Sequence, residues 1–490
     1  MKINTLLLII IAFNINAYTL NSTPTRVTNI GPDLNKDYDA EESSIAFNNL
    51  NNEYYIVFEA THYITGTGVN SAAEVEIYAQ RVNSTTETNI GAPSRVSQMG
   101  PDGDTAYDAR NPDVTYNSLN NEYLVVWYGD TNNGGVVEGE FEIWGKRINA
   151  STGQAIGSQF RISQMGPIGN RSYDAIDPVV AYNSTNNNYL VVWRGEDGNL
   201  PSAIGEFEIF AQQISSSGQE LGSDDFKVSD MGADNSALYD AYSPSIDYNA
   251  INNEFLVVWY GDDNNAGHVS GEFEIYGQRI DANNGIELGV NDFLISETGV
   301  PGFITRAAQF PSITWNNNLN EYLVAWSADP ATGNNVGNEF EIFGQVLTAT
   351  GSQIGVDDFP ISNMGPLGDN NYDAFRPDVG YLQSQNSYVV VWRGDHEFDG
   401  EFEIYFQPIN ESSQLRMEPS DIRISHAGPD DSILYDARRA SLIVNNNSQK
   451  VQVIWEQEDE SANQTIGEIE IFGSTIEVDL DMIFTNGFEQ

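Results

Sequence analysis

Apolar and polar residues alternate along the chain in short runs, and the same arrangement of runs returns at regular intervals. One unit contains four strand-like runs, at residues 113–116, 123–127, 141–148 and 160–164. The segments between the runs are rich in Asn, Gly, Ser and Asp, which is typical of turns. No run has the period of an amphipathic helix. The pattern therefore predicts an all-β unit of four strands.

The unit recurs seven times. An aromatic residue closes the second run of each copy about every 66 residues, at Phe58, Trp127, Trp193, Trp259, Trp326, Trp392 and Trp455. A Glu-x-Glu pair follows each aromatic residue, and a Tyr-Asp-Ala triplet precedes all but the fifth of them at the same distance, with the first triplet at Tyr38. Seven four-stranded copies without helices predict a seven-bladed β-propeller with antiparallel blades. A β-solenoid is the alternative, although solenoid coils are usually shorter than this period.

The second run is apolar on both of its faces, because Tyr123, Val125 and Trp127 alternate with Leu124 and Val126. An antiparallel sheet with one wet face would instead alternate apolar and polar residues. Two apolar faces indicate a sheet that lies between two others, as the blades of a propeller do.

Seven segments resemble Arg95-Val-Ser-Gln-Met-Gly100 and read as the outermost strand of a blade. The first segment, residues 26–31, precedes every blade that it could complete, and the last copy ends after its third strand. We expect residues 26–30 to pair with that third strand and to close the ring, which satisfies an open sheet edge. Residues 477–483 are the competing candidate for this position.

The chain begins with Lys2, an apolar run and Ala17, which together predict a secretory signal at residues 1–17. The apolar run is too short to span a bilayer. A leader at 18–24, a single propeller domain at 25–476 and a tail at 477–490 complete the expected organisation. We expect a secreted or cell-surface monomer without a transmembrane segment. It has no cysteine, so its stability must come from the core and from ring closure.

Acidic residues outnumber basic ones by 71 to 21, which gives a net charge of −50. This balance excludes nucleic-acid binding and electrostatic adhesion to anionic membranes. It favours solubility, cation binding or a cationic partner. The four histidines occupy no shared position of the repeat.

In a four-stranded meander, the loops after the second and fourth strands emerge on the same face. These loops and the adjoining strand start carry the Trp-x-Gly-Asp, Tyr-Asp-Ala and Glu-x-Glu acids, which predicts a carboxylate-rich face. The acids could solvate the protein, accept backbone N–H bonds or hold Ca²⁺, which takes six to eight oxygen ligands. Calcium is the candidate cofactor, and the candidate ligands are Asp108, Asp130, Glu140, Glu142, Asp240, Asp262, Glu272, Glu274, Asp373, Asp395, Glu401 and Glu403.

The second Glu of each pair lies in a strand that is expected to be buried; Glu142, for example, stands between Phe141 and Ile143. A buried carboxylate without a partner is costly. Arginines on the same strand, such as Arg147, are absent from several copies. We therefore predict glutamates that are hydrogen-bonded or bridged by cations, and a loss of stability in Glu142→Leu.

No Ser/His/Asp arrangement, cysteine or histidine pair indicates catalysis, although paired carboxylates keep a glycosidase open. The tripeptide Arg393-Gly394-Asp395 occupies the ordinary Trp-x-Gly-Asp position, so we interpret it as part of the repeat. The fifth copy departs most from the pattern, with Phe303, Arg306 and Phe310. Asymmetry of the central channel there is the best place to look for a ligand.

The runs Tyr-Leu-Val-Val-Trp and Glu-Ile-Tyr-Gly-Gln-Arg (274–279) resemble repeats of large secreted bacterial proteins, whose roles are mostly unassigned. The resemblance implies a β-propeller module. We predict a binding or scaffold module for an extracellular protein or glycan; the alternative is a hydrolase or lyase acting on extracellular glycans. An enzyme should have a deep axial pocket with unlike residues from two or three blades, whereas a binder should have a shallow, repeated surface.

Overall fold

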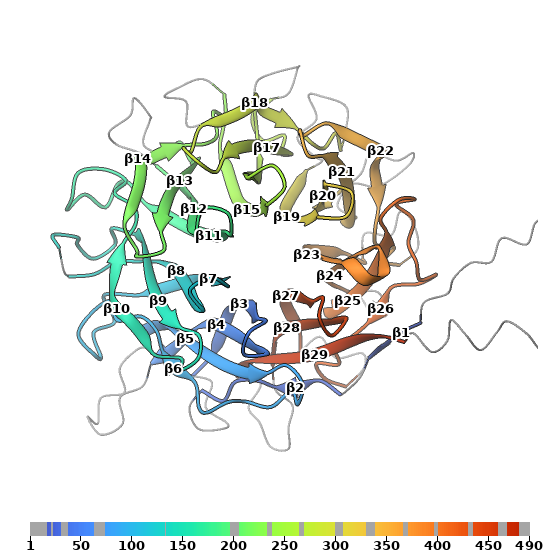
Figure 1. Cartoon of the computed structure of the whole chain (residues 1–490), viewed down its shortest axis with the longest axis horizontal. Coiled ribbons are helices and arrows are strands. Elements are labelled where there is room, and N and C mark those ends of the chain that lie inside the picture. The colour runs from blue at the N-terminus through green and yellow to red at the C-terminus, as the bar shows by residue number, and fades with distance from the viewer. Residues whose placement is uncertain are drawn as a thin grey trace, which may run out of the picture.

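The computed structural model describes residues 17–20, 23–30, 38–62, 74–132, 134–196, 205–232, 238–263, 269–298, 307–329, 339–365, 371–395, 400–429, 435–458 and 468–479. Within them, seven antiparallel sheets are arranged as blades around a central axis (Figure 1). This confirms the seven-bladed β-propeller, and the stacked solenoid is wrong. Most of the predicted signal sequence and the tail beyond residue 479 lie outside the described residues. No helix of the described part is long and apolar enough to cross a bilayer.

Each blade is a meander whose first strand is innermost. The first three blades are β3 (Ala40–Asn48), β4 (Glu53–His62), β5 (Glu74–Asn83) and β6 (Ser94–Arg95); β7 (Ala109–Asn117), β8 (Glu122–Gly129), β9 (Glu142–Asn149) and β10 (Ala155–Arg161); and β11 (Ala175–Asn183), β12 (Asn188–Gly195), β13 (Glu208–Ser215) and β14 (Glu220–Lys227). Blades four and five are β15 (Ala241–Asn249), β16 (Glu254–Gly261), β17 (Glu274–Asp281) and β18 (Glu287–Leu294); and β19 (Ala308–Asn316), β20 (Glu321–Ala328), β21 (Glu341–Thr348) and β22 (Gln353–Pro360). Blade six is β23 (Ala374–Leu382), the 3-10 turn η2 (Gln383–Gln385), β24 (Ser387–Gly394), β25 (Glu403–Asn410) and β26 (Ile422–Arg423), and blade seven contains β27 (Ala437–Asn445), β28 (Lys450–Glu458) and β29 (Ile469–Asp479).

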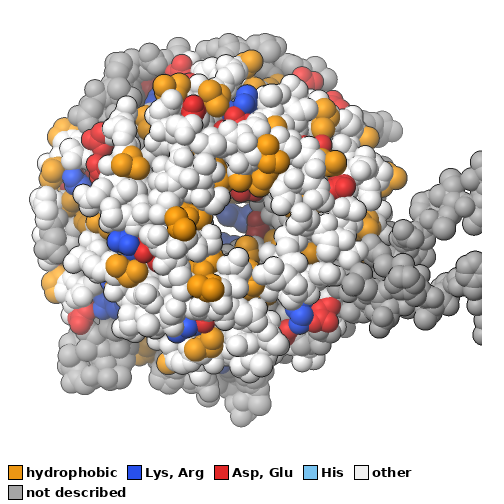
Figure 2. Space-filling view, in the orientation of Figure 1, with side chains coloured by type: hydrophobic (Ala, Val, Ile, Leu, Met, Phe, Trp, Pro, Cys, Tyr) orange, Lys and Arg blue, Asp and Glu red, His pale blue; other side chains and the backbone are white. Residues whose placement is uncertain are grey.

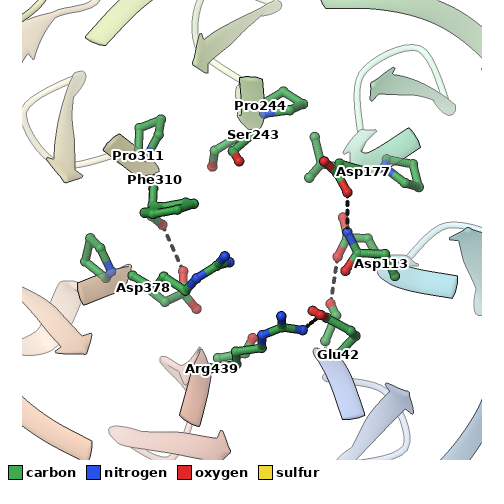
Figure 3. A pocket seen from close by; sticks show the side chains of 18 of the residues that line it. Glu42, Asp113, Asp177, Ser243, Pro244, Phe310, Pro311, Asp378 and Arg439 are labelled. Atoms are coloured by element: carbon green, nitrogen blue, oxygen red, sulfur yellow. Dashed lines mark hydrogen bonds and ion pairs between the residues drawn. The ribbon is translucent and has the colours of Figure 1, made fainter. Parts of the chain in front are cut away.

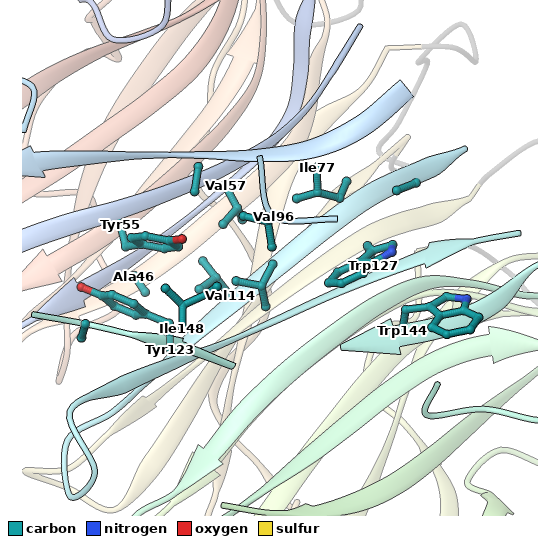
Figure 4. Close-up of a cluster of buried hydrophobic side chains, with 14 of the residues drawn as sticks. Ala46, Tyr55, Val57, Ile77, Val96, Val114, Tyr123, Trp127, Trp144 and Ile148 are labelled. Carbon is teal, nitrogen blue, oxygen red and sulfur yellow. The ribbon is translucent and has the colours of Figure 1, made fainter. Parts of the chain in front are cut away.

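The second strands form the core of the disc. In β8 the six residues from Glu122 to Trp127 are all buried, as the apolar pattern on both faces predicts. Between blades one and two, Tyr55 and Tyr123 stack with ring centroids 4.3 Å apart, and Trp127 lies farther along the same interface (Figure 4). Removing such an indole by Trp→Ala costs about 3–5 kcal/mol. Packing between blades therefore supplies the stability that disulfides do not.

The ring closes as predicted. β2 (Thr25–Arg26) pairs with β29 through Thr25 with Gly473 and Arg26 with Phe472. β29 also pairs with β1 (Ala17–Leu20), an edge strand that the sequence pattern did not predict. The competing candidate is wrong for its described residues, because Glu477–Asp479 extend β29 itself. Both ends of the propeller are thus held in one sheet.

Every first strand contains an irregularity near its start. The pairing of β7 with β8 slips between Arg110 and Asp113, and Asn111 at this bulge has φ of 52°. All seven first strands have the same slip and the same positive φ, at Glu42, Asn111, Asp177, Ser243, Phe310, Arg376 and Arg439. Bulges redirect side chains. Here the structure repeats one backbone geometry around the axis, while the residue that occupies it changes from blade to blade.

The axis is open at the centre of the disc. Figure 2 shows one face, on which acidic side chains are few and a central opening has charged side chains of both signs in its depth. A band of largely buried aliphatic residues from the first strands surrounds the axis: Ile45, Val114, Val180, Ile246, Ile313, Val379 and Leu442. Polar and charged residues of the seven bulges lie beside this band, and they form the pocket described below.

Candidate functional site

The second glutamate of every Glu-x-Glu pair binds the outermost strand of its own blade. Glu142 accepts hydrogen bonds from the Ser163 hydroxyl and from the Met165 N–H, which lies 3.2 Å away. The same bonds join Thr28, Ser97, Ser229, Ser296, Ser362 and Ser425 to the glutamate of their blades. This clasp between the third and outermost strands is the hydrogen-bonded state predicted for the buried glutamates.

A basic residue joins the clasp in four blades. Arg95 pairs with Glu74 at 3.0 Å and also with Glu76, and Lys227 lies 3.2 Å from Glu208. Arg26 pairs with Glu470, and Arg423 pairs with Glu403. The third-strand arginines instead bind the opposite end of the blade, where Arg147 lies 2.7 Å from Glu122. Where Leu294 and Pro360 replace the base, the hydroxyl and N–H donors remain.

Burial controls the ionisation of these glutamates. It raises the pKa of Glu142, Glu208 and Glu341 to about 8 and that of Glu274 to about 7, because desolvation outweighs the donors that stabilise the charge. These four glutamates therefore carry less negative charge near neutral pH than the sequence count assigns to them.

The aspartates of the predicted carboxylate face also accept backbone N–H groups. Asp130 receives the N–H of Asp108 at 2.9 Å and that of Gly139 at 2.6 Å. Asp108 in turn receives the N–H of Val75 from the preceding blade, at 3.1 Å. The equivalent bonds hold Asp240, Asp262, Asp373 and Asp395. The prediction that the Asp of Tyr-Asp-Ala accepts backbone N–H bonds is confirmed, but the bond joins neighbouring blades and does not fix a local turn.

The twelve candidate metal ligands thus lie on one face, as predicted, but they are dispersed among three blades. Nine are buried, and Asp108, Asp240 and Asp373 are half-buried. The first glutamates serve loops as well: Glu140 accepts the N–H groups of Val137 and Gly169, and Glu401 pairs with Arg423. Among the described residues no group of three or more His, Asp or Glu side chains is arranged to hold a metal ion. Calcium binding stays a prediction.

The Arg393-Gly394-Asp395 tripeptide also serves the repeat. Asp395 is 3% exposed and accepts the Gly400 N–H at 2.9 Å. Arg393 lies with its guanidinium carbon 4.1 Å from the centre of the Phe402 ring.

The unlike residues of the molecule meet on the axis. The seven bulges surround a pocket of about 620 Å³ (Figure 3), within the range of ligand-binding clefts. Their side chains differ in every blade except six and seven, which both carry arginine: Glu42, Asn111, Asp177, Ser243, Phe310, Arg376 and Arg439. Unlike residues around the axis are one of the features predicted for an enzyme.

One side of the pocket is aromatic and basic. Tyr260 packs against Tyr242 at 5.4 Å and against Phe310 at 5.5 Å between ring centroids. Arg194 lies over the Tyr242 ring at 5.1 Å, and Arg376 lies over the Phe310 ring at 4.1 Å. Half-exposed aromatic faces with guanidinium groups beside them suit a flat, polar ligand such as a sugar ring.

The opposite side, in blades seven and one, carries a paired acid and base, with two buried carboxyl groups behind them. Glu42 pairs with Arg439 (Figure 3), and the Glu42 N–H donates to Glu456 at 2.7 Å. Burial raises the pKa of Glu456 to about 8 and that of Glu59 to about 7. Glu59 receives the Asn111 N–H at 2.8 Å. Two buried carboxyl groups with raised pKa values thus accept backbone N–H bonds from residues that line the pocket, and perturbed carboxyl groups are frequent at functional sites.

Sequence reasoning identified one of these residues. Phe310 was singled out, and it lines the pocket; Phe303 and Arg306 lie outside the described residues. The other bulge residues do not stand out in the sequence, because they do not recur as the acids do. The sequence does contain a sign of them, in a position that varies where its surroundings repeat. In five copies, the residue before a proline near the start of the first strand differs inside an otherwise repeated segment.

Comparison with known proteins shows the fold and leaves the family open. No family model matches the chain, and no curated protein matches its sequence. Among solved structures it resembles a polysaccharide lyase, an ulvan lyase, with a TM-score of 0.54 and 8% identity over 90% of this chain and 95% of that one. It also resembles an arabinofuranosidase of Fusarium graminearum (TM-score 0.46, 10% identity, 93% and 98% covered). A third is the propeller domain of the Trilobed protease of Pyrococcus furiosus (TM-score 0.46, 9% identity, 92% and 98% covered).

Proposed function

We propose that this protein is an extracellular propeller enzyme that cleaves a glycan bound in the axial pocket. One observation carries the proposal: the backbone of the seven bulges is repeated, whereas the side chains that they present to the pocket differ. A scaffold that used the repeat itself would present equivalent residues from every blade. The recurrent acids do not provide such a surface, because protein donors occupy them.

The chemistry of the pocket suits a saccharide. Tyr260 and Phe310 provide ring faces on which a sugar can stack, and Asn111, Asp177 and Ser243 provide hydrogen-bonding groups. Glu456, whose pKa is about 8, holds a proton at neutral pH and is our candidate general acid. Glu59, whose pKa is about 7, is our candidate base.

The fold is compatible with this role. The structural neighbour with a TM-score of 0.54 is named a polysaccharide lyase, so a propeller of this kind can serve glycan cleavage. The signal sequence predicted at residues 1–17 would place the protein where extracellular glycans occur.

The proposal is tested by incubating the purified protein with a panel of acidic and neutral polysaccharides. New reducing ends indicate hydrolysis, and an unsaturated product with ultraviolet absorbance indicates a lyase. Glu456→Gln keeps an oxygen acceptor for the Glu42 N–H but cannot donate a carboxyl proton, so we expect folded protein with at least about tenfold lower activity. The control is Glu138→Gln at an exposed position on the acidic face. Absence of both cleavage and binding across the panel would overturn the proposal, and an unchanged Glu456→Gln would remove that residue from the mechanism.

A further inference from the structure

Among the described residues, two arginines of blade six have no carboxylate at ion-pair distance. Arg376, at the bulge of β23, lines the axial pocket and lies 4.1 Å from the centre of the Phe310 ring. Arg393, on the neighbouring strand β24, lies over Phe402 at 4.1 Å and over Phe375 at 5.9 Å. Within the described part of the chain, no carboxylate lies at ion-pair distance from either guanidinium. In a chain with 71 acidic residues, this arrangement is unexpected.

The other arginines around the pocket are paired. Arg194 pairs with Asp177 at 2.7 Å, Arg439 pairs with Glu42, and Arg438 lies 3.2 Å from Asp436. Arg194 is the closest counterpart of Arg393. It occupies the same Trp-Arg-Gly position in its blade and also stacks on aromatic rings, yet it has a carboxylate partner. Stacking alone therefore does not account for the missing carboxylate in blade six.

The unpaired arginines also repel each other. Burial lowers the pKa of Arg393, the nearby carboxylate of Asp436 raises it, and the charges of Arg438 and Arg376 lower it again. Burial likewise lowers the pKa of Arg376. Arginine nevertheless remains a cation in proteins. An anion placed beside both groups would relieve the repulsion and fill their free donors.

The structure assigns this pair an external partner: we propose that Arg376, assisted by Arg393, binds the acidic group of the glycan, a carboxylate or a sulfate ester. A guanidinium presents a planar fork of N–H donors that fits either group with two parallel bonds. Phe310 holds the Arg376 fork from one side and provides an apolar face for the adjoining sugar. The inference rests on the proposed function and adds the charge of the substrate to it.

The net charge of −50 does not oppose this assignment at close range. Many acids are engaged by N–H, hydroxyl or arginine donors, and exposed charges are screened within about 8 Å at physiological salt. From blade six, Arg376, Pro377 and Asp378 line the pocket, and Arg393 lies behind them on the neighbouring strand.

Binding of matched oligosaccharides tests the inference. Isothermal titration compares tetragalacturonate with galactotetraose, which lacks its carboxylates, and a sulfated oligosaccharide distinguishes sulfate from carboxylate recognition. We expect an acidic ligand to bind more tightly, with affinity about 10- to 100-fold lower in Arg376→Gln and a smaller loss in Arg393→Gln. Arg171→Gln, which removes an exposed arginine, is the control and should bind like the wild type.

Thermal melting in sodium sulfate against sodium chloride of equal ionic strength supplies a second readout that needs no glycan. Sulfate should stabilise the wild type and Arg171→Gln more than Arg376→Gln. If neutral and acidic glycans bind equally and Arg376→Gln changes neither, the glycan function stands and this inference is overturned. If no glycan binds but the sulfate effect depends on Arg376, the anion site stands and the proposed function fails. If no glycan binds and sulfate stabilises the wild type no more than Arg376→Gln, both the proposed function and this inference are refuted.

Discussion

Replacing Glu142 by leucine removes the acceptor that joins the third and outermost strands of blade two. The Met165 N–H and the Ser163 hydroxyl lose their bonds to the carboxyl group. The serine keeps one contact, because its oxygen accepts the Ile143 N–H at 2.7 Å. Each buried donor left without an acceptor costs about 1–3 kcal/mol, and the buried leucine returns about 1–2 kcal/mol. We therefore expect a net loss of about 2–4 kcal/mol.

This loss can be converted into a melting temperature. Unfolding entropy of about 2.1 cal/mol/K per residue gives roughly 0.9 kcal/mol/K for the propeller, so the loss corresponds to a decrease of about 2–4 °C. Calorimetry is the assay, because agreement of calorimetric and van't Hoff enthalpies shows whether the ring unfolds as one unit. Glu142→Gln retains an oxygen acceptor and should lose less than about 1 kcal/mol.

The control is Glu138→Leu at an exposed position on the same loop, which should stay within about 0.5 kcal/mol of the wild type. Equal melting temperatures for Glu142→Leu and Glu138→Leu would refute the clasp as a source of stability.

Three further predictions concern the same architecture. Because the folded state keeps the pKa of Glu142 near 8, above its ordinary value of 4.5, it holds a proton that the unfolded chain has released. Urea unfolding should therefore show stability falling from about pH 5 to pH 8, by up to about 1.4 kcal/mol per pH unit for each such group, with a shallower slope in Glu142→Gln; an equal slope would contradict this. Deletion of residues 25–30 removes the Thr28 and Ile30 donors to Glu470 and should lower the melting temperature markedly; an unchanged temperature would mean that the ring needs no closing strand. The calcium prediction is tested by melting in calcium and in chelator: the bonded carboxylates lead us to expect equal temperatures, and a rise in calcium would favour metal sites.

The sequence predicted the architecture well because the architecture repeats. The spacing of Trp127 and its counterparts gives the number of blades, and two apolar faces on one strand place that strand between neighbouring sheets. The boundaries were less accurate. β7 begins at Ala109 rather than at 113, since Asn111 and Pro112 at the bulge resemble a turn. β10 spans Ala155–Arg161 rather than 160–164, because an exposed outer strand is largely polar.

The candidate site could not be predicted in the same way. The recurrent acids attract attention, yet Glu142 and Asp130 recur because each copy needs the same internal bonds. The pocket is formed by residues that do not recur, such as Phe310 and Arg376, and their position on the axis depends on a bulge that the apolar pattern does not reveal. Only the folded ring brings these residues together.

The crystal structure of the protein with a bound acidic oligosaccharide tests the account most directly. We predict density for the sugar in the axial pocket, with a ring against Phe310 and an acidic group within hydrogen-bonding distance of Arg376. Density confined to the outer loops or to the grooves between blades would contradict it.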